Sequence, residues 1–249
     1  MAQQGLVGSR VVVERNYAVL PPENIPESVL PDWSDTAARI LTAPAMGAAF
    51  VQYRLDLKAG GGAGMTTPER LEGFFFVLEG SVQLDLNGQG HTLEVGGYAY
   101  LAPGSRFAMS AGSKGASLLW LKKKFEPWGE TLPEDVVGDE RRMPGETYMG
   151  IEGLILKTLI PNEPAYDMAM NIFTFPPGHS LPVTETHVME HGLYFLQGQG
   201  VYYLGDRWME VKAGDFIWMG PYCPQSFYAT GTEPSRYIYY KNVNRDVTL

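Results

Sequence analysis

The 249-residue chain contains a single cysteine, Cys223, and only four histidines. One cysteine cannot form a disulfide within a chain, and it cannot build a thiolate metal cluster. The sequence therefore excludes a disulfide-stapled fold and a zinc-thiolate module. A cysteine nucleophile would need a histidine base, and the two histidines that lie close together are better explained as metal ligands.

Basic residues are scarce too, with 19 Lys and Arg against 28 Asp and Glu, a net charge of -9 and a pI near 5.0. Nucleic acids and anionic membrane surfaces need a basic footprint, so we expect neither as a partner. No run approaches the roughly 18 apolar residues of a membrane-spanning helix, and Met1–Arg10 has no apolar signal core. We therefore expect a soluble, cytoplasmic protein.

Helical periodicity is also scarce, whereas glycine and proline are abundant, at 29 and 18 residues. They separate short runs rich in Val, Tyr, Phe and Leu, such as residues 49–57 and 195–204. Alternating runs bounded by turn-forming residues are typical of antiparallel strands, and strands at this spacing form a sandwich or a barrel. We predict an all-β protein.

The chain repeats itself at an offset of 118 residues, which aligns Gly60 with Gly178. Residues 76–80 then fall on residues 194–198, an apolar run that ends in glycine both times. A one-residue adjustment is assumed in the turn before Gly97. A repeat of this length indicates two homologous β domains in one chain.

The domain boundaries follow from composition. We predict an N-terminal β domain over residues 1–125 and a C-terminal β domain over residues 149–249. Residues 126–148 between them are rich in Pro, Gly and acidic side chains, which is typical of a linker.

The candidate chemistry is concentrated in the segment Glu185-Thr-His187-Val-Met-Glu190-His191. Two of the four histidines lie here, together with carboxylates, and these are the ligands that divalent transition metals use. Two solvated histidines on an acidic loop are the alternative, and the repeat weighs against it.

Strand geometry restricts how these residues can meet. Glu185 and His187 are two positions apart, so on a strand they share a face. On the same strand, His191 would lie roughly 13 Å beyond His187, too far for a common ion. The chain must therefore turn within residues 188–190, and Gln225 must come from a third strand.

A helical alternative exists, because residues 187–191 also fit the metallopeptidase pattern H-x-x-E-H, which requires a helix. Pro182 precedes the pattern, Gly192 follows it, and the next residues are mainly aromatic and aliphatic. A three-turn helix does not fit this segment. We interpret Glu190 as a solvated turn residue rather than a base.

The spacing of these residues resembles the two motifs of the cupin superfamily. Gly178 and Gly198 open and close the first motif, and Gly214 and Gly220 belong to the second, with Gln225 in its histidine position. The ligand positions of the first motif fall on Glu185, His187 and His191. The resemblance implies a bicupin, two tandem double-stranded β-helix (jelly-roll) barrels.

The site does not survive transfer to the N-terminal half. Its counterparts there are Thr67, Glu69, Gly73 and Ala108, so three of four ligand types are lost. We expect one metal per chain, held by the C-terminal barrel. Two imidazoles with a carboxylate and an amide oxygen favour Mn²⁺ or Fe²⁺ over copper, and Zn²⁺ can compete by affinity.

At closer range, residues 185–192, 197–202, 214–220 and 237–246 resemble the (S)-ureidoglycine aminohydrolase family, bicupin enzymes of allantoin and purine catabolism. The likeness extends weakly through the N-terminal half. It implies a Mn²⁺-dependent hydrolase acting on a C–N bond, which releases ammonia from (S)-ureidoglycine to give (S)-ureidoglycolate. The implied metal ligands are Glu185, His187, His191 and Gln225, and the implied substrate contacts are Glu185, Gln225, Tyr237 and Lys241.

The residues themselves agree with part of this. Tyr237 and Lys241 are four positions apart in a strand-like segment, so they share a face. A lysine on the inward face of an aromatic strand is uncommon unless it meets an anion, and a lysine reaching out to solvent is the alternative. We assign catalytic roles to Lys241 and to Glu185, which can carry a proton to the leaving nitrogen.

Two other functions remain open at this point. One is a regulatory bicupin that binds a small acid without turnover, and the other is a different metal-cupin enzyme, such as a dioxygenase. Oxygenases use histidine-richer ligand sets, so Glu185 and Gln225 weigh against the second. The expected partner is a small ureido amino acid, and a homo-oligomer is expected by analogy with other cupins.

Overall fold

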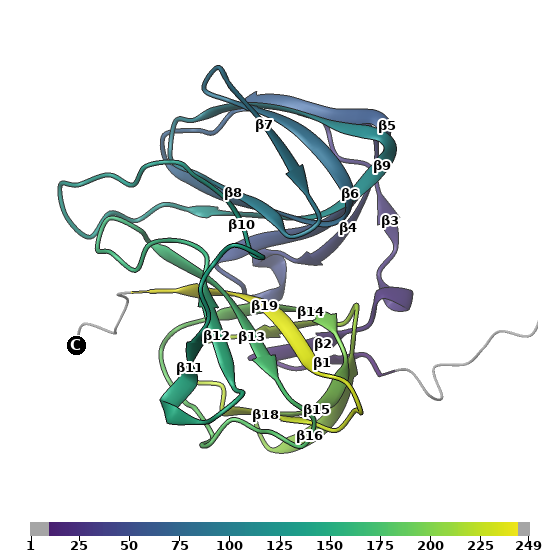
Figure 1. The fold of residues 1–249 in the computed structure, drawn as a ribbon, viewed down its shortest axis with the longest axis vertical. Coiled ribbons are helices and arrows are strands. Elements are labelled where there is room, and N and C mark those ends of the chain that lie inside the picture. The colour runs from purple at the N-terminus through teal and green to yellow at the C-terminus, as the bar shows by residue number, and fades with distance from the viewer. Residues whose placement is uncertain (1–9, 244–249) are drawn as a thin grey trace, which may run out of the picture.

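The structure is a computed structural model that describes residues 10–243 (Figure 1). The expectations for Met1–Ser9, the outer domain boundaries and the family-like residues 244–246 lie outside the described residues. The described part contains strands and three short 3-10 helices but no α-helix, which confirms the all-β prediction. Within it, no helix has the length and apolarity needed to cross a bilayer.

The N-terminal half contributes β3 (Glu27–Ser28), β4 (Trp33–Thr42), β5 (Phe50–Thr66), β6 (Leu71–Leu86), β7 (Gln89–Glu94), β8 (Gly97–Leu101) and β9 (Arg106–Lys124). Before them come β1 (Val12–Val13) and β2 (Tyr17–Leu20), and the connection holds β10 (Val136–Asp139) and β11 (Glu146–Thr147). The C-terminal half contributes β12 (Ile155–Thr158), β13 (Met168–Phe175), β14 (His191–Gln197), β15 (Gln199–Leu204), β16 (Arg207–Lys212), β17 (Phe216–Met219), β18 (Gln225–Ala229) and β19 (Ser235–Asn242). The 3-10 helices are η1 (Pro22–Asn24), η2 (Pro44–Met46) and η3 (Tyr148–Gly150).

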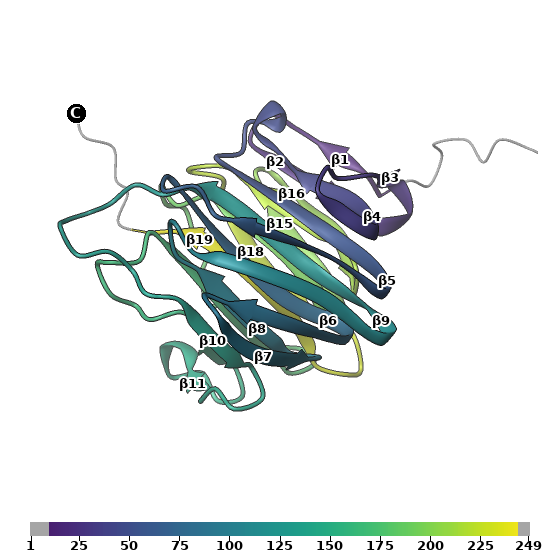
Figure 2. The ribbon, with the colours of Figure 1, turned by 90° about the horizontal axis from the view of Figure 1, so that it is seen from above.

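The strands form two stacked barrels, as a bicupin requires. The N-terminal sheet has the order β10-β8-β6-β9-β5-β4-β3, with β7 paired to β6. The C-terminal half has an eight-stranded sheet, β1-β2-β17-β14-β19-β13-β12-β11, and a three-stranded sheet, β16-β15-β18. Figure 1 shows one half above the other. Figure 2, seen from above, shows that the long strands of the two halves run in a similar direction.

Buried side chains form three layers, one inside each barrel and one between the barrels. Strand β6 shows why its apolar run is continuous rather than alternating. Phe75 points into the N-terminal barrel, whereas Phe74 and Phe76 belong to the layer between the halves. Successive strand residues face opposite sides, so a strand with two buried faces needs apolar residues throughout.

The two halves follow the 118-residue offset through the second turn as well. The pair Ser81 and Glu94 in the β6–β7 hairpin corresponds without a shift to Gln199 and Lys212 in the β15–β16 hairpin. The assumed one-residue adjustment is therefore wrong, and the residue that corresponds to Gly214 is not Gly97.

The backbone explains the error at the double glycine. Gly96 has φ +84° and Gly214 has φ +91°, a conformation that glycine adopts without strain. Both amides donate to the equivalent carbonyl on the preceding strand, Gly96 to Val77 and Gly214 to Phe195, each at 2.9 Å. The turn needs one left-handed glycine, and in the N-terminal half that is the first of the pair.

The first eleven described residues belong to the other half. Strand β2 pairs with β17, with Val19 opposite Ile217, so the chain crosses over to extend the C-terminal sheet. The guanidinium of Arg10 donates to both carboxylate oxygens of Asp215, which is fully buried. Residues 10–20 thus cover the edge of β17, although the predicted N-terminal domain included them.

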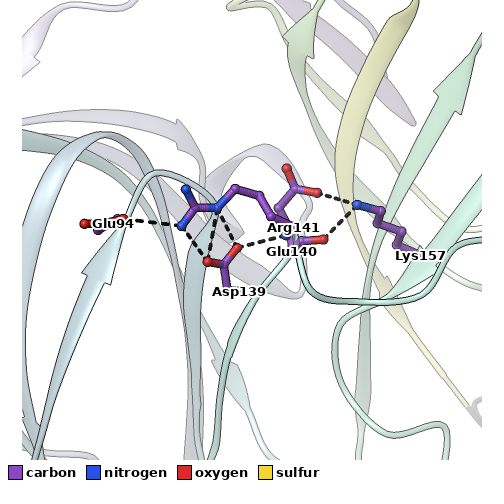
Figure 3. Close-up of polar contacts among 5 residues, drawn as sticks. All are labelled: Glu94, Asp139, Glu140, Arg141 and Lys157. Atoms are coloured by element: carbon purple, nitrogen blue, oxygen red, sulfur yellow. Dashed lines mark hydrogen bonds and ion pairs between the residues drawn. The ribbon is translucent and has the colours of Figure 1, made fainter.

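The predicted linker supplies one strand to each half. Strand β10 pairs with β8, and β11 pairs with β12. Between these strands, Glu140 accepts from Lys157 at 2.9 Å, while Arg141 contacts Glu94 at 3.5 Å (Figure 3). Glu140 also accepts from Arg236 at 2.8 Å. The connection is thus bonded to both halves, and the division into independent domains at residues 125 and 149 stays a prediction.

A candidate metal and substrate site in the C-terminal barrel

A cavity of about 280 Å³ opens into the C-terminal barrel. Its wall carries all the residues that the sequence singled out: Glu185, His187, His191, Gln225, Tyr237 and Lys241. The rest of the wall is mainly aromatic and aliphatic, with a few polar side chains.

Three separate segments bring the ligand candidates together. Glu185 and Gln225 form an antiparallel backbone pair, with N···O distances of 2.8 and 2.9 Å. His187 lies in the following turn, where its carbonyl accepts from the Tyr222 amide at 2.8 Å. The chain then turns back, and His191 is the first residue of β14.

The two histidines face each other. The Nε2 atoms of His187 and His191 are 3.3 Å apart, and the Gln225 side-chain nitrogen is 3.2 Å from Nε2 of His187. Burial, together with the neighbouring His187, lowers the pKa of His191 to about 3, so its ring is neutral. Its Nδ1 lies 3.1 Å from the Tyr240 carbonyl and donates to it, which leaves a lone pair on Nε2.

This arrangement fits a divalent cation. Two ring nitrogens bound at about 2.1 Å in neighbouring positions around one ion are separated by roughly 3.0 to 3.4 Å, which brackets the His187–His191 distance. The oxygen and nitrogen of the Gln225 side-chain amide are similar in size, so the amide can rotate by half a turn in the same space. Its oxygen, which can bind a metal, then lies on the His187 side. The Nδ1 of His187 is buried and has no hydrogen-bond partner among the described residues.

The Glu185 carboxylate lies apart from this group. Its Oε1 accepts from the Tyr148 hydroxyl at 2.9 Å, and burial with this contact raises the pKa of Tyr148 to about 12. Within residues 10–243, no three His, Cys, Asp or Glu side chains stand close enough to hold a metal as they lie. Three of the four predicted ligands therefore converge, and Oε2 is the Glu185 oxygen that can join them while the bond to Tyr148 is kept.

Two hydrogen-bonded tyrosines, Tyr202 and Tyr237, lie beside Gln225. Before the half-turn, the Tyr202 hydroxyl donates to the Gln225 oxygen at 3.4 Å; after it, the hydroxyl would accept from the Gln225 nitrogen instead. The hydroxyls of Tyr202 and Tyr237 are hydrogen-bonded to each other. Burial raises the pKa of both tyrosines, so both stay neutral. Tyr237 is 2 % exposed, and it lines the cavity together with Tyr202.

Lys241 brings a cationic group to the cavity wall. In the sheet it lies directly opposite His191, and it shares the inward face of β19 with Tyr237, as predicted. Burial lowers the pKa of Lys241, and the charge of Glu185 opposes this. In the described chain its ammonium makes no hydrogen bond or ion pair, so it can meet an anion in the cavity.

Comparison with known proteins gives the relationship. The cupin domain family model matches residues 171–240. The chain is 36% identical to (S)-ureidoglycine aminohydrolase from Escherichia coli, over 99% of this chain and 96% of that protein. It is 38% identical to the enzyme of the same name from Arabidopsis thaliana, over 96% of this chain and 79% of that protein.

The chain belongs to the (S)-ureidoglycine aminohydrolase family. Solved structures agree with this assignment. The crystal structure of protein Ylba from E. coli matches with a TM-score of 0.88 and 33% identity, over the whole of both chains. A putative glyoxylate induced protein from Pseudomonas aeruginosa matches with a TM-score of 0.88 and 34% identity, over 97% of this chain and 94% of that one. Oxalate decarboxylase from Bacillus subtilis shares the fold, with a TM-score of 0.70 at 12% identity over 92% of this chain and 78% of its own. The chain is thus an enzyme of the aminohydrolase family with a bicupin fold.

Three cavity residues of this aminohydrolase family member were missed in the sequence. Tyr148 falls at the end of the predicted linker, where nothing marks it as functional. Asn171 and Tyr239 face each other across β13 and β19, and their side chains are hydrogen-bonded. The apolar alternation of β13 places Asn171 on the inward face, so a polar residue there was the available signal.

Glu190 is not a solvated turn residue. It is 2 % exposed, accepts from the Trp218 indole at 2.8 Å and accepts from the Ala49 amide at 3.1 Å. Its pKa is raised, chiefly by burial. Ala49 lies 141 positions away in the N-terminal half, so local sequence gave no indication that this carboxylate joins the two barrels.

The N-terminal barrel has aromatic side chains at the equivalent place. Leu86 pairs with Phe107 as Leu204 pairs with Gln225, so the counterpart of Gln225 is Phe107 rather than Ala108. A Cβ on Gly73, the counterpart of His191, would come within 2.4 Å of the Trp120 ring. Trp120 stacks on Phe75 at 4.0 Å. These side chains offer no nitrogen or oxygen ligand to a cation, and a single site per chain stays a prediction.

Proposed function

We propose that this protein is a Mn²⁺-dependent (S)-ureidoglycine aminohydrolase, which releases ammonia and gives (S)-ureidoglycolate during allantoin breakdown. The observation that carries the proposal is the convergence of His187, His191 and Gln225 beside Lys241, whose ammonium has no partner among residues 10–243. The cavity thus combines a candidate cation site with a fixed positive charge, and the substrate offers a carboxylate, an amine and a ureido group.

The reaction replaces one C–N bond by a C–O bond. Water supplies the oxygen, and the leaving nitrogen takes a proton and departs as ammonia. A bound divalent cation would act as a Lewis acid that holds and polarises the substrate. Lys241 would neutralise or hydrogen-bond the substrate's anionic or carbonyl end, and the hydrogen-bonded tyrosines would orient Gln225 toward it.

Glu185 is the proposed proton carrier, because a carboxylate can take a proton from water and deliver it to the leaving amine. Its backbone pairing with Gln225 fixes where the side chain starts. The small cavity restricts the substrate to a few orientations, which supports selection of one enantiomer. The proposal includes Fe²⁺ or Zn²⁺ as alternative metals in the purified protein.

The proposal also includes a cytoplasmic location and a homo-oligomeric state, both taken from the family resemblance. No nucleic acid or membrane partner is part of it.

Ammonia release from freshly prepared (S)-ureidoglycine tests the proposal, with the uncatalysed release subtracted. We expect the metal-stripped protein to be inactive and Mn²⁺ to restore release. His187→Ala should stay inactive in excess Mn²⁺, because a four-ligand site loses one imidazole. If the Mn²⁺-loaded parent releases no ammonia above background, the hydrolase is ruled out and a small-acid-binding bicupin is left.

A further inference from the structure

The carboxylate of Glu185 is attached to a residue outside the metal group. The Tyr148 hydroxyl donates to Oε1 at 2.9 Å. Tyr148 begins the 3-10 helix η3 and is the last residue of the connection between the barrels. The connection thus contributes a side chain to the cavity of the C-terminal barrel.

The position of Tyr148 is set by the fold rather than by Glu185. Its ring packs edge-on against Phe173, with centroids 4.9 Å apart. Its amide donates to the Leu154 carbonyl at 2.8 Å, and its carbonyl accepts from the Ile151 amide at 3.0 Å. The ring contact and the two backbone hydrogen bonds fix the position of the Tyr148 hydroxyl. The Glu185 side chain has three rotatable torsions, so it can adjust to this fixed donor.

The contact with Tyr148 makes the two oxygens of the Glu185 carboxylate different. Oε1 accepts from Tyr148 and keeps a second lone pair with which it can carry a proton, and Oε2 has no hydrogen-bond partner in the described part of the chain. A carboxylate whose one oxygen accepts a hydrogen bond from a fixed donor is oriented, so its other, free oxygen is the one turned toward a cation. Partners of this kind, which orient a metal ligand without touching the metal, commonly change metal affinity or activity by about 10- to 100-fold.

We propose that Tyr148 is a positioning residue for Glu185, which holds Oε1 so that Oε2 faces the cation site formed by His187, His191 and Gln225. The inference rests on the metal site of the proposed function. It assigns the single-oxygen binding mode of Glu185 to the inter-barrel connection.

The alternative is that Tyr148 touches the substrate, because its side chain also lines the cavity. The two roles differ in what happens before substrate is present. A substrate contact leaves the affinity for Mn²⁺ alone unchanged, whereas a positioning residue alters it.

The test is Mn²⁺ binding to the metal-stripped protein without substrate, followed by the electron paramagnetic resonance signal of the free ion. Tyr148→Phe keeps the ring against Phe173 and removes only the hydroxyl. We expect its Kd for Mn²⁺ to rise by about tenfold or more, with an unchanged thermal transition. The control is Tyr203→Phe, which removes a hydroxyl from the outer face of the same barrel beside Trp208 and should leave the Kd unchanged.

A second pair of variants isolates the route through Glu185. In a Glu185→Ala background, Tyr148→Phe should cause no further loss of Mn²⁺ affinity, because the group through which it acts is gone. An unchanged Kd in Tyr148→Phe overturns the inference, and so does a loss that adds fully to that of Glu185→Ala. If the parent binds Mn²⁺ but releases no ammonia, the proposed function is wrong and the positioning role stands or falls on the Kd values.

Discussion

Lys241 places an ammonium group in a cavity that is otherwise mainly aromatic and neutral. The strand register puts it opposite His191, so the charge is fixed beside the candidate cation site rather than at a distant rim. Desolvated charges of this kind are tolerated when an anion or a strong dipole completes them. The geometry therefore favours contact with substrate over a purely structural role.

Lys241→Met tests that contact. Methionine keeps the apolar stem, so the fold and the Mn²⁺ content should be retained. Loss of a charge-assisted contact in a partly buried site should lower kcat/KM by about 30- to 1000-fold, equivalent to roughly 2–4 kcal/mol. Steady-state ammonia release, with metal content measured on the same samples, checks this. A metal-replete variant with the parent's kcat/KM would show that Lys241 does not meet the substrate.

Individual site residues were predictable where they form a compact motif. Glu185, His187 and His191 stand out because their spacing implies a turn, and that turn is present before β14. Glu190 belongs to the same motif, yet its role depends on Ala49 and Trp218, which only the packed barrels bring near. Tyr148 could not be found for the same reason. Its contact with Glu185 exists only because the connection between the barrels ends at the cavity of the folded C-terminal barrel.

The connection between the barrels is an element with its own electrostatics. Glu140 is 8% exposed and is bonded to Lys157 and Arg236, which come from the C-terminal sheet. Burial alone would raise the pKa of Glu140, but the hydrogen bonds from Arg236 and Lys157 outweigh it and the pKa is lowered. The folded state therefore binds this proton more weakly than the unfolded chain does.

Glu140→Gln should lower the free energy of unfolding by about 1–3 kcal/mol near neutral pH, because two partly buried cations lose their counter-charge. A depressed folded pKa gives stability that is present above the ordinary value of 4.5 and is lost as pH falls through the folded pKa. The difference between variant and parent should thus shrink below about pH 4.5. Urea unfolding at a series of pH values measures it.

The control for this element is Glu94→Gln. Its carboxylate is 67% exposed and 3.5 Å from Arg141 (Figure 3), so solvent screens the pair and little change is expected at any pH. A pH-independent effect of Glu140→Gln, or an equal effect of Glu94→Gln, would contradict the assignment.

Strand existence and facing were predictable at the element scale, whereas exact alignment was not. The alternation in β19 placed Tyr237 and Lys241 on one face, and both line the cavity. The double glycine at the start of β8 misled the alignment, because sequence does not show which of two glycines takes the left-handed conformation. The β6–β7 pairing resolved it and changed the counterpart of Gln225 to Phe107.

At the scale of the whole molecule, two barrels with matching strand pairings have different interiors. One is filled by Phe75, Phe107 and Trp120, and the other keeps an open cavity with nitrogen and oxygen donors. Pairs of aromatic rings in contact add to stability beyond their buried area. The division of roles predicts a metal stoichiometry.

We expect one equivalent of Mn²⁺ per chain after reconstitution, measured by elemental analysis on protein of known concentration. His191→Ala should reduce this to near zero, since the N-terminal barrel has Gly73 at that position. Two equivalents in the parent, or one that persists in His191→Ala, would place a metal in the N-terminal barrel and contradict the prediction.

Because residues 10–20 pair with the C-terminal sheet, they can take their native place only after that sheet has formed. Arg10 and Asp215 are 205 positions apart, so this contact closes a loop that includes nearly the whole chain. Loops of that length are entropically costly to close and slow to find, and on a ribosome the early strand must wait until its partner has been synthesised. Until then the edge of β17 is open, and an open edge can pair with a neighbouring chain. Residues 10–20 complete the C-terminal sheet, and by covering the edge of β17 they also protect the folded molecule from aggregation.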